Sequence, residues 1–478
     1  MNNNNIVSGV FWSLGERVIA QLVSFSISIV LARMLSPDDY GVVAILLIFI
    51  SLADVFVSNG FGTALIQDKN ADKDDFSTLF FCSLTVSIVI YCLLFLLAPF
   101  IADFYNDASI IPLMRVLAIR IPISAYNTIQ RAYISRNMMF QKFFFVTLIG
   151  TTISAVIGIY MAFCGAGAWA LVAQYLTNAV VDSITLSGMV EWKPTIVFKV
   201  DRARKLLSYG WKILAAEFVG TLFDQIQSLL IGKTFTAADL AYYNKGNQIP
   251  NMISSNINNS VMTVLFPAIS NKGNDYKDIK NMSQRAVRMM MFIVFPLMFG
   301  LALVARPLIL ILLTDKWAES IQYMRVLSFS VAFSLVGNTG LQTIKAVGRS
   351  DLLLKIELYK KPVFILSLFI GMHFGVLGVA ISATIYSFYA MVINFGAMGK
   401  IIQYTMFEQM RDLIDVGKLA VLMSGFVWLV NLLNLTSNIA DLILKCLVGG
   451  VSYILLSLIT HSKEFKYAIN LVRMKLAQ

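Results

Sequence analysis

The sequence predicts an all-α polytopic membrane protein, and three features lead to this fold class. Of the 478 residues, 58% are hydrophobic and only 14% are charged, compared with about 25% charged in a typical soluble domain. The mean hydropathy is +0.74, and apolar runs of roughly 20 residues, the length of a membrane helix, recur along the whole chain. The polar stretches between them are short, so the sequence leaves no room for a separate soluble domain.

Apolar windows divided by polar residues predict fourteen transmembrane helices. The predicted spans lie near 9–31, 41–61, 77–100, 109–130, 143–163, 165–188, 209–231, 247–269, 286–313, 318–342, 358–374, 376–397, 415–435 and 440–460. Glu16 and Arg17 interrupt the first apolar run, and no small-residue cleavage site follows it. We therefore interpret this run as an uncleaved first span rather than a signal peptide.

The basic residues favour one orientation of these spans. With the N-terminus placed in the cytoplasm, 27 of the 38 Lys and Arg residues fall in cytoplasmic segments and 5 fall on the opposite side. Such an excess on one side is the pattern of the positive-inside rule, and it accounts for the net charge of +11 as attraction to an anionic leaflet. The sequence thus predicts that both termini lie in the cytoplasm. Nucleic-acid binding is not needed to explain the positive net charge.

A weak internal repeat relates the two halves of the chain. Residues 31–41, LARMLSPDDYG, align with IGKTFTAAD at 231–239, and the tetrapeptide MRVL occurs at 114–117 and again at 324–327. Each half holds six predicted spans, an even number, so the two repeats have the same topology and are parallel. Ser36-Pro37-Asp38 is typical of a turn that ends one helix and caps the next.

The repeat predicts two packed six-helix lobes around a central cavity, with two further helices at the C-terminus. We assign residues 1–190 to the N-lobe, 191–208 to a basic amphipathic cytoplasmic linker, 209–400 to the C-lobe, and 401–478 to the last two spans and a cytoplasmic tail. Two lobes with a seam between them are typical of a transporter that alternates access to a central site.

Charged residues within the apolar spans indicate what this cavity carries. A basic side chain facing lipid at mid-depth costs roughly 2.5–3.5 kcal/mol, so these residues are expected to face an interior. Helical spacing supports this, because Arg120, Ser124, Asn127 and Arg131 form one stripe, and Glu217, Thr221, Asp224 and Ser228 form another. The residues predicted to line the cavity are Arg17, Arg120, Arg115, Lys212, Arg325, Asn127, Asn258 and Gln342.

Structural roles for the same residues remain open alternatives. Arg17 and Lys212 lie near a cytoplasmic end and can snorkel to the headgroups. Arg115 and Arg325 occupy equivalent repeat positions, which favours a role shared by both lobes as much as ligand contact. Asp54 and Asp182 can serve as caps or as partners of basic residues.

Guanidinium groups and polar amides suit an anionic, hydroxyl-rich cargo, because Arg binds phosphate bidentately and amides bind sugar hydroxyls. Glu16, Glu217 and Asp224 are candidates for coupling transport to an H⁺ or Na⁺ gradient, and counter-ion roles are the alternative. No catalytic motif, cofactor or metal site is expected, since the two His lie far apart and the four Cys form no C-x-x-C pair.

At LARMLSPDDYGVVAILLIF the sequence resembles the polysaccharide (oligosaccharide) flippase family of the multidrug/oligosaccharidyl-lipid/polysaccharide exporter superfamily, in the branch of colanic acid and teichuronic acid exporters. The resemblance covers the whole chain and continues in several short segments. They include GFGTALI at 60–66, APFIADFY at 98–105, WALVAQ at 169–174, LFPA at 265–268 and KAVGRSD at 345–351.

The resemblance implies a flippase that moves undecaprenyl-pyrophosphate-linked repeat units across the bacterial plasma membrane for capsule, exopolysaccharide or lipopolysaccharide synthesis. It implies membrane lipids, a polysaccharide polymerase and glycosyltransferases as partners, and a groove for the lipid tail between the last two helices. A multidrug cation antiporter of the same superfamily is the alternative. A membrane polymerase or ligase is disfavoured, because the longest outer loop has only about 15 residues and no catalytic motif.

Overall fold

The computed structural model describes residues 3–67, 72–270 and 275–476, and all regular structure in these ranges is helical. For residues 3–18 and a few other helical stretches, only the backbone is described. Nine helices in the described ranges are long and apolar enough to cross a membrane. The predicted all-α polytopic fold class is confirmed.

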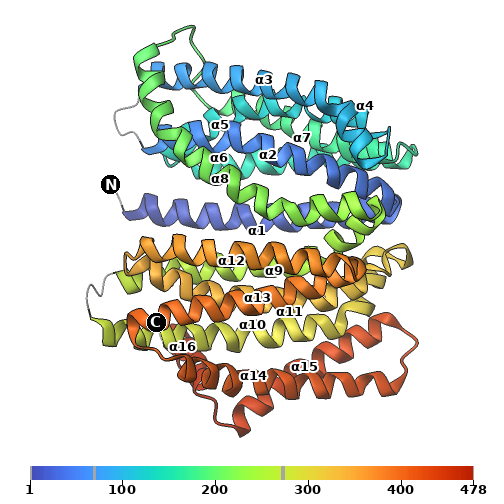
Figure 1. Cartoon of the computed structure of the whole chain (residues 1–478), viewed down its shortest axis with the longest axis vertical. Helices are drawn as coiled ribbons and strands as arrows, with labels where there is room; N and C mark the ends of the chain where they lie inside the picture. The colour runs from blue at the N-terminus through green and yellow to red at the C-terminus, as the bar shows by residue number, and fades with distance from the viewer. Residues whose placement is uncertain (1–2, 68–71, 271–274, 477–478) are drawn as a thin grey trace. The chain divides into compact units, whose positions relative to one another are not determined.

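By its contacts the chain divides into two units, Met1–Ala241 and Tyr242–Gln478. Unit 1 contains α1 (Asn3–Met34), α2 (Pro37–Gln67), α3 (Lys73–Tyr105), α4 (Ile110–Leu117), α5 (Arg120–Arg136), α6 (Phe140–Phe163), α7 (Ala168–Met189) and α8 (Val200–Thr234). Within it, α2 packs against α5, α3 and α8, and α6 packs against α7 and α1 (Figure 1).

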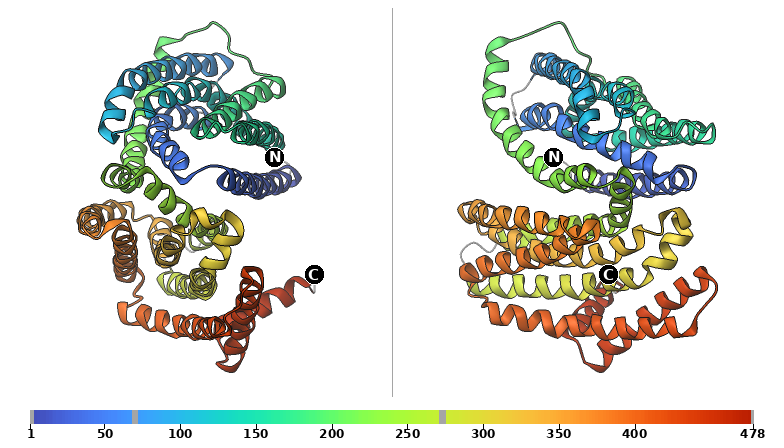
Figure 2. Two further views of the ribbon diagram at one scale, coloured as in Figure 1. Left: turned by 90° about the vertical axis from the view of Figure 1, so that its right-hand side faces the viewer. Right: turned by 45° about the vertical axis from the view of Figure 1, so that its right-hand side comes forward.

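Unit 2 begins within α9 (Ala237–Ser270), whose first turn belongs to unit 1 and whose remainder belongs to unit 2. It contains α10 (Tyr276–Leu313), the short η1 (Asp315–Trp317), α11 (Ser320–Ala346), α12 (Ser350–Met372), α13 (Gly375–Ile402), α14 (Met406–Leu429), η2 (Val430–Leu433), α15 (Asn438–Ile459) and α16 (Lys463–Leu476). In this unit α11 packs against α10 and α13, and the C-terminal helices α14 and α15 pack against α10 (Figure 2).

Each of the fourteen predicted spans coincides with helical structure, although the helix ends differ from the predicted bounds, by up to ten residues at the start of α10. The span predicted at 109–130 is divided into α4 and α5, because Pro122 has no N–H to donate and its ring crowds the carbonyl of Ala118, four residues earlier. In the predicted linker, residues 191–199 are not helical, and α8 begins at Val200 and continues through the next predicted span.

The contact-based boundary after Ala241 differs from the predicted lobe boundaries, since α8 packs with α2 and α3 in unit 1. Contacts in one conformation do not define which helices move together. The division into 1–190, 191–208, 209–400 and 401–478 therefore stays a prediction.

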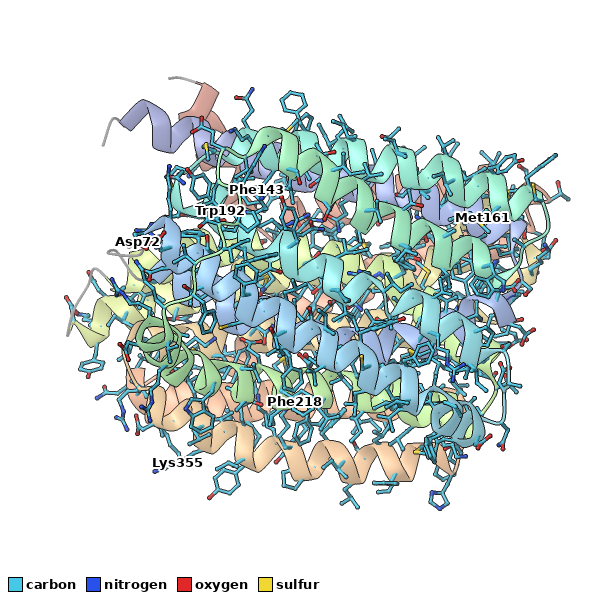
Figure 3. The ribbon with its side chains drawn as sticks, turned by 90° about the horizontal axis from the view of Figure 1, so that it is seen from above. Asp72, Phe143, Met161, Trp192, Phe218 and Lys355 are labelled. Atoms are coloured by element: carbon cyan, nitrogen blue, oxygen red, sulfur yellow. The ribbon has the colours of Figure 1, made fainter. Side chains whose placement is uncertain are left out.

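A buried aromatic cluster anchors one end of unit 1. Trp192 is 3% exposed and packs on Phe76 and Phe80 of α3, and its indole Nε1 donates a hydrogen bond to the Lys73 carbonyl at 3.3 Å. Figure 3 shows Trp192 and Phe143 at the same end of the unit as Asp72, with Met161 at the other end. This cluster fixes the chain between α7 and α8 against the end of α3.

The repeated turns of the two halves have the same cap geometry. Ser36 and Asp39 bond reciprocally at the start of α2, with Ser36 N donating to Asp39 Oδ2 at 3.0 Å and Asp39 N donating to Ser36 Oγ at 3.2 Å. Thr236 and Asp239 form the same pair of bonds at the start of α9, each at 3.1 Å. The predicted turn, which ends one helix and caps the next, is thus confirmed at Ser36.

Candidate functional site

A polar pocket of about 460 Å³ lies inside unit 1, between α2, α5 and α7. Its lining is Asp54, Gly62, Arg120, Ser124, Asn127, Thr128, Arg131, Ala132, Ser135, Asn178, Ala179 and Asp182. Polar and charged side chains on helices with otherwise apolar surfaces mark a hydrated or ligand-binding interior in a membrane protein. This pocket is the candidate functional site.

Helix α5 supplies most of the polar surface. Arg120, Ser124, Asn127 and Arg131 all line the pocket, as the spacing of i, i+4, i+7 and i+11 predicts for one helical face. At 1.5 Å per residue, the Cα atoms of the two arginines are about 16 Å apart along the helix. The predicted stripe on this helix is therefore present, and it places one cation at each end of the pocket.

Each arginine of the pocket is paired with an aspartate from a different helix. Arg120 Nη2 lies 3.4 Å from Asp54 Oδ2 of α2, and both side chains are about one quarter exposed, at 28% and 25%. Arg131 Nη2 donates to Asp182 Oδ2 of α7 at 2.8 Å. The predicted alternative that Asp54 and Asp182 pair with basic residues is thus what the structure shows.

The two carboxylates are only partly satisfied by these ion pairs. Among the described residues, Asp54 Oδ1 and Asp182 Oδ1 are buried without a hydrogen-bond partner. Buried polar atoms left unpaired are unusual in folded proteins and often belong to functional sites. Each Asp therefore retains an acceptor oxygen that a water, a proton or a polar ligand group can satisfy.

Gly150 of α6 makes room for Asp182. A Cβ on Gly150 would lie 2.1 Å from Asp182 Oδ1 and 3.1 Å from Asn178 Nδ2, far inside ordinary contact distance. Gly150 was not predicted as a site residue, since a helix–helix approach of this kind leaves no periodic signal in the sequence.

Asn127 connects two helices in the pocket wall. Its Nδ2 donates to the Ala179 carbonyl at 3.1 Å, and its Oδ1 accepts from Ser183 Oγ at 2.6 Å. These bonds occupy both ends of the amide, and the residue is only 8% exposed. In this conformation Asn127 holds α5 against α7.

The pocket has a balanced charge rather than a bare cationic surface, since two guanidinium groups face two carboxylates. An anionic group that enters it must compete with Asp54 for Arg120 or with Asp182 for Arg131. Arg131 is the more accessible cation, with 44% of its side chain exposed. The arrangement can therefore exchange an internal carboxylate for the phosphate or carboxylate of a ligand.

The other predicted site residues lie outside this pocket. Arg115 stacks on the Phe95 ring at 4.2 Å, and Arg325 is exposed on α11. Glu217 and Asp224 are both exposed on α8, and Asn258 and Gln342 are partly buried in unit 2. The side chains of Glu16, Arg17 and Lys212 lie outside the described residues.

A second, apolar groove of about 450 Å³ lies between α14 and α15 in unit 2. Its lining includes Phe426 of α14 and Leu447, Val451, Leu455 and Ile459 of α15. Among the residues that the structure describes, no group of three or more His, Cys, Asp or Glu is placed to bind a metal ion.

Comparison with known proteins places these features in a family. The model of the family described as "Polysaccharide biosynthesis protein" matches residues 30–322, more than half of the chain. The succinoglycan biosynthesis transport protein ExoT of Rhizobium meliloti is 23% identical over 353 residues, which cover 74% of this chain and 72% of the relative. The lipopolysaccharide biosynthesis protein WzxC of Escherichia coli is 24% identical over 400 residues, which cover 81% of this chain and 80% of the relative. The teichuronic acid biosynthesis protein TuaB of Bacillus subtilis is 25% identical over 357 residues, which cover 73% of this chain and 72% of the relative.

Solved structures show the same fold at low identity. The lipid II flippase MurJ in an inward closed conformation aligns with a TM-score of 0.74 and 14% identity, over 95% of this chain and 99% of that chain. An inward-facing multidrug resistance MATE family transporter aligns with a TM-score of 0.62 and 14% identity, over 84% of this chain and 96% of that chain. Both matches confirm the transporter fold predicted from the repeat.

Proposed function

Because the chain belongs to the family of polysaccharide biosynthesis proteins, we propose that it is a flippase that moves lipid-linked oligosaccharide repeat units across the bacterial plasma membrane. The relatives named for succinoglycan, lipopolysaccharide and teichuronic acid synthesis support a role in surface polysaccharide assembly. On this proposal the chain is a transporter and not an enzyme, and glycosyltransferases and a polymerase act before and after it.

The observation that carries the proposal is the Arg–Asp pocket within an apolar helical unit. A lipid-linked oligosaccharide combines a pyrophosphate with sugar hydroxyls. Arg120 and Arg131 supply donors for the anionic group, and Ser124, Thr128 and Asn178 supply partners for hydroxyls. The roles proposed for Arg17, Lys212, Arg115 and Arg325 stay predictions, and Arg120 is the first residue to test.

The polyprenyl part of such a cargo needs an apolar surface, since each buried CH₂ contributes about 0.8 kcal/mol. The groove between α14 and α15 offers one, and Leu447, Val451 and Leu455 lie along its α15 side. We propose that this groove holds the lipid tail, as the sequence resemblance also implies.

We further propose that an H⁺ or Na⁺ gradient drives transport, with Glu16, Glu217 and Asp224 as the predicted coupling residues. Selective collapse of one gradient with an ionophore, while surface export is followed, identifies the ion. Both termini are proposed to be cytoplasmic on the basis of the 27 basic residues assigned to that side. Reporter fusions at residue 478 and in the predicted outer loop at 315 test this orientation.

The proposed function is tested by export in a host that lacks its own flippase. Arg120→Ala is expected to reduce surface polysaccharide by tenfold or more, and Arg120→Lys is expected to restore only part of it, because Lys binds phosphate at a single point. Arg349→Ala is the matched control, since Arg349 forms an exposed ion pair with Asp351 and does not line the pocket. Full export by Arg120→Ala at normal protein levels would contradict the proposed cargo site.

A multidrug cation antiporter is the second candidate, favoured by the carboxylate oxygens of Asp54 and Asp182 that remain without partners. It predicts efflux of a lipophilic cationic dye from vesicles that contain the purified protein. The proposed function predicts translocation of a lipid-linked sugar in the same vesicles, with no dye efflux.

A further inference from the structure

A second polar pocket lies in unit 2, at the start of α10 and beside α16. Its volume is about 410 Å³. It is lined by Asn281, Gln284, Arg285, Arg288 and Met289 of α10 and by Lys463, Glu464 and Tyr467 of α16. Neither the transport cargo nor the Arg–Asp pocket of unit 1 accounts for this site.

One ion network holds the walls of this pocket together. Arg288 of α10 bonds Asp412 of α14 through Nη1 and Glu464 of α16 through Nε. Ser462 Oγ also donates to Glu464 Oε2 at 2.8 Å. Two carboxylates therefore pair with Arg288, which gives this network a net charge of −1, and α16 is fixed against α10 without using the other cations of the pocket.

Two further cations face the pocket. Arg285 and Lys463 are exposed, and among the described residues neither forms an ion pair with a carboxylate. The Arg285 guanidinium lies 5.1 Å from the centre of the Tyr467 ring, which orients it between α10 and α16. Lys463 is the first residue of α16, where the helix dipole adds positive potential. The pocket thus has two cations without a carboxylate partner, and together with the Arg288 network its net charge is +1.

The position of the pocket along α10 suggests its occupant. Residues 281–289 form the early turns of a 38-residue helix that is long and apolar enough to cross a membrane. Asn281 adds a hydrogen-bonding amide beside the cations, and Met289 adds an apolar edge. Gln284 contributes its amide oxygen, since its Nε2 donates to Asp412 Oδ2 at 2.8 Å. Basic pockets at the membrane interface between helices are suited to anionic lipid headgroups.

We propose that the pocket between α10 and α16 binds the phosphate headgroup of an anionic phospholipid of the surrounding leaflet. Arg285 binds the phosphate through its guanidinium, and Lys463 adds a second positive charge. Asn281 and the amide oxygen of Gln284 bond hydroxyl groups of the headgroup. A bound lipid joins α16 to α10 in addition to the Arg288 network. The site is independent of the proposed cargo pocket.

The test measures lipid binding to the purified full-length protein in neutral detergent. Phosphatidylglycerol is titrated while the thermal unfolding midpoint is followed, and phosphatidylcholine and glycerol phosphate are titrated in parallel. Phosphatidylglycerol is expected to raise the midpoint. In Arg285→Gln/Lys463→Gln its apparent affinity is expected to fall by about tenfold or more, since each basic residue near a membrane contributes about 1 kcal/mol to anionic lipid binding.

The matched control is Arg411→Gln/Lys400→Gln, which removes one exposed Arg and one exposed Lys outside the pocket and should leave the affinity unchanged. Arg285→Lys/Lys463→Arg keeps both charges and should retain most of the binding. Equal lipid affinity in the wild type and in Arg285→Gln/Lys463→Gln would overturn the proposal. Glycerol phosphate that binds as tightly as the lipid would also overturn it, because the site would then recognise a small free anion.

Discussion

Gly41 and Ala237 lie in direct backbone contact: a Cβ on Gly41 would fall 1.9 Å from the Ala237 carbonyl oxygen. Gly41 is in the first two turns of α2, and Ala237 is the first residue of α9. The two helices begin with the same reciprocal cap, so the duplicated turns of the sequence pack against each other. Only glycine allows this approach.

Substitution of Gly41 by Ala is therefore expected to destabilise the protein. The added methyl group must displace the backbone at Ala237, and overpacking of this kind costs about 1–3 kcal/mol. Thermal unfolding in detergent measures the loss. Gly188→Ala is the control, since its Cβ would meet no atom within 4 Å, and Ala is the better helix former by about 1 kcal/mol. Equal unfolding midpoints for the two variants would show that the contact is not tight.

The two caps are expected to contribute similar stability. Ser36→Ala and Thr236→Ala each remove a hydroxyl that accepts from a backbone N–H at the start of a long helix, and such losses cost about 1 kcal/mol. Ser109→Ala provides the comparison, because Ser109 precedes α4 but makes no side-chain cap bond. If Ser109→Ala destabilises the protein as much as Ser36→Ala does, the hydroxyl bonds are not the cause.

Local sequence signals account for much of what could be predicted. The cap at Ser36 and the stripe of Arg120, Ser124 and Asn127 each depend on residues within a few turns of one another, and both are present in the structure. Apolar runs likewise located all fourteen predicted spans on helices. The matching Asp72–Asp75 and Asp275–Asp278 caps were missed, although their spacing repeats in the same way.

Contacts between helices distant in the sequence could not be predicted. The pairing of Arg120 with Asp54 depends on how α2 packs against α5, and spacing along either helix does not reveal it. The break before α5 was missed because a proline does not always end a membrane helix, as continuous α3 with Pro99 shows. At Pro122 the break coincides with the end of the short α4.

Gly150→Ala is expected to disturb the pocket of unit 1. The new methyl group would overlap Asp182 Oδ1 and push the carboxylate away from Arg131. We expect lower stability and reduced export, with a smaller added effect in an Asp182→Ala background, where the overlap is absent. A double-mutant cycle on the unfolding midpoint measures this coupling. Additive effects of the two substitutions would indicate that Gly150 does not act through Asp182.

The attachment of α16 is expected to weaken in acid. Burial raises the pKa of Glu464, whereas hydrogen bonds from Arg288 and Ser462 lower it. The lowering outweighs the effect of burial, so the pKa lies below its usual range. A carboxyl group whose pKa is lower in the folded state stabilises the fold at pH values above its unfolded-state pKa, about 4.3. This contribution is lost as the pH falls through the folded-state pKa. After correction for the intrinsic pH dependence of the chemistry, amide exchange in α16 should therefore be slow at pH 6 and faster below about pH 4.

Glu464→Gln separates this effect from general acid unfolding. The amide keeps the shape of the side chain but carries no charge at any pH, so α16 should exchange faster than in the wild type at pH 6. Its exchange, after correction for the intrinsic pH dependence of the chemistry, should change little on acidification. Asp351→Asn is the comparison, because Asp351 also has a lowered pKa, about 2, but pairs with Arg349 at the start of α12. Acid-induced opening of α16 that is equal in the wild type and in Glu464→Gln would show that Glu464 is not the group responsible.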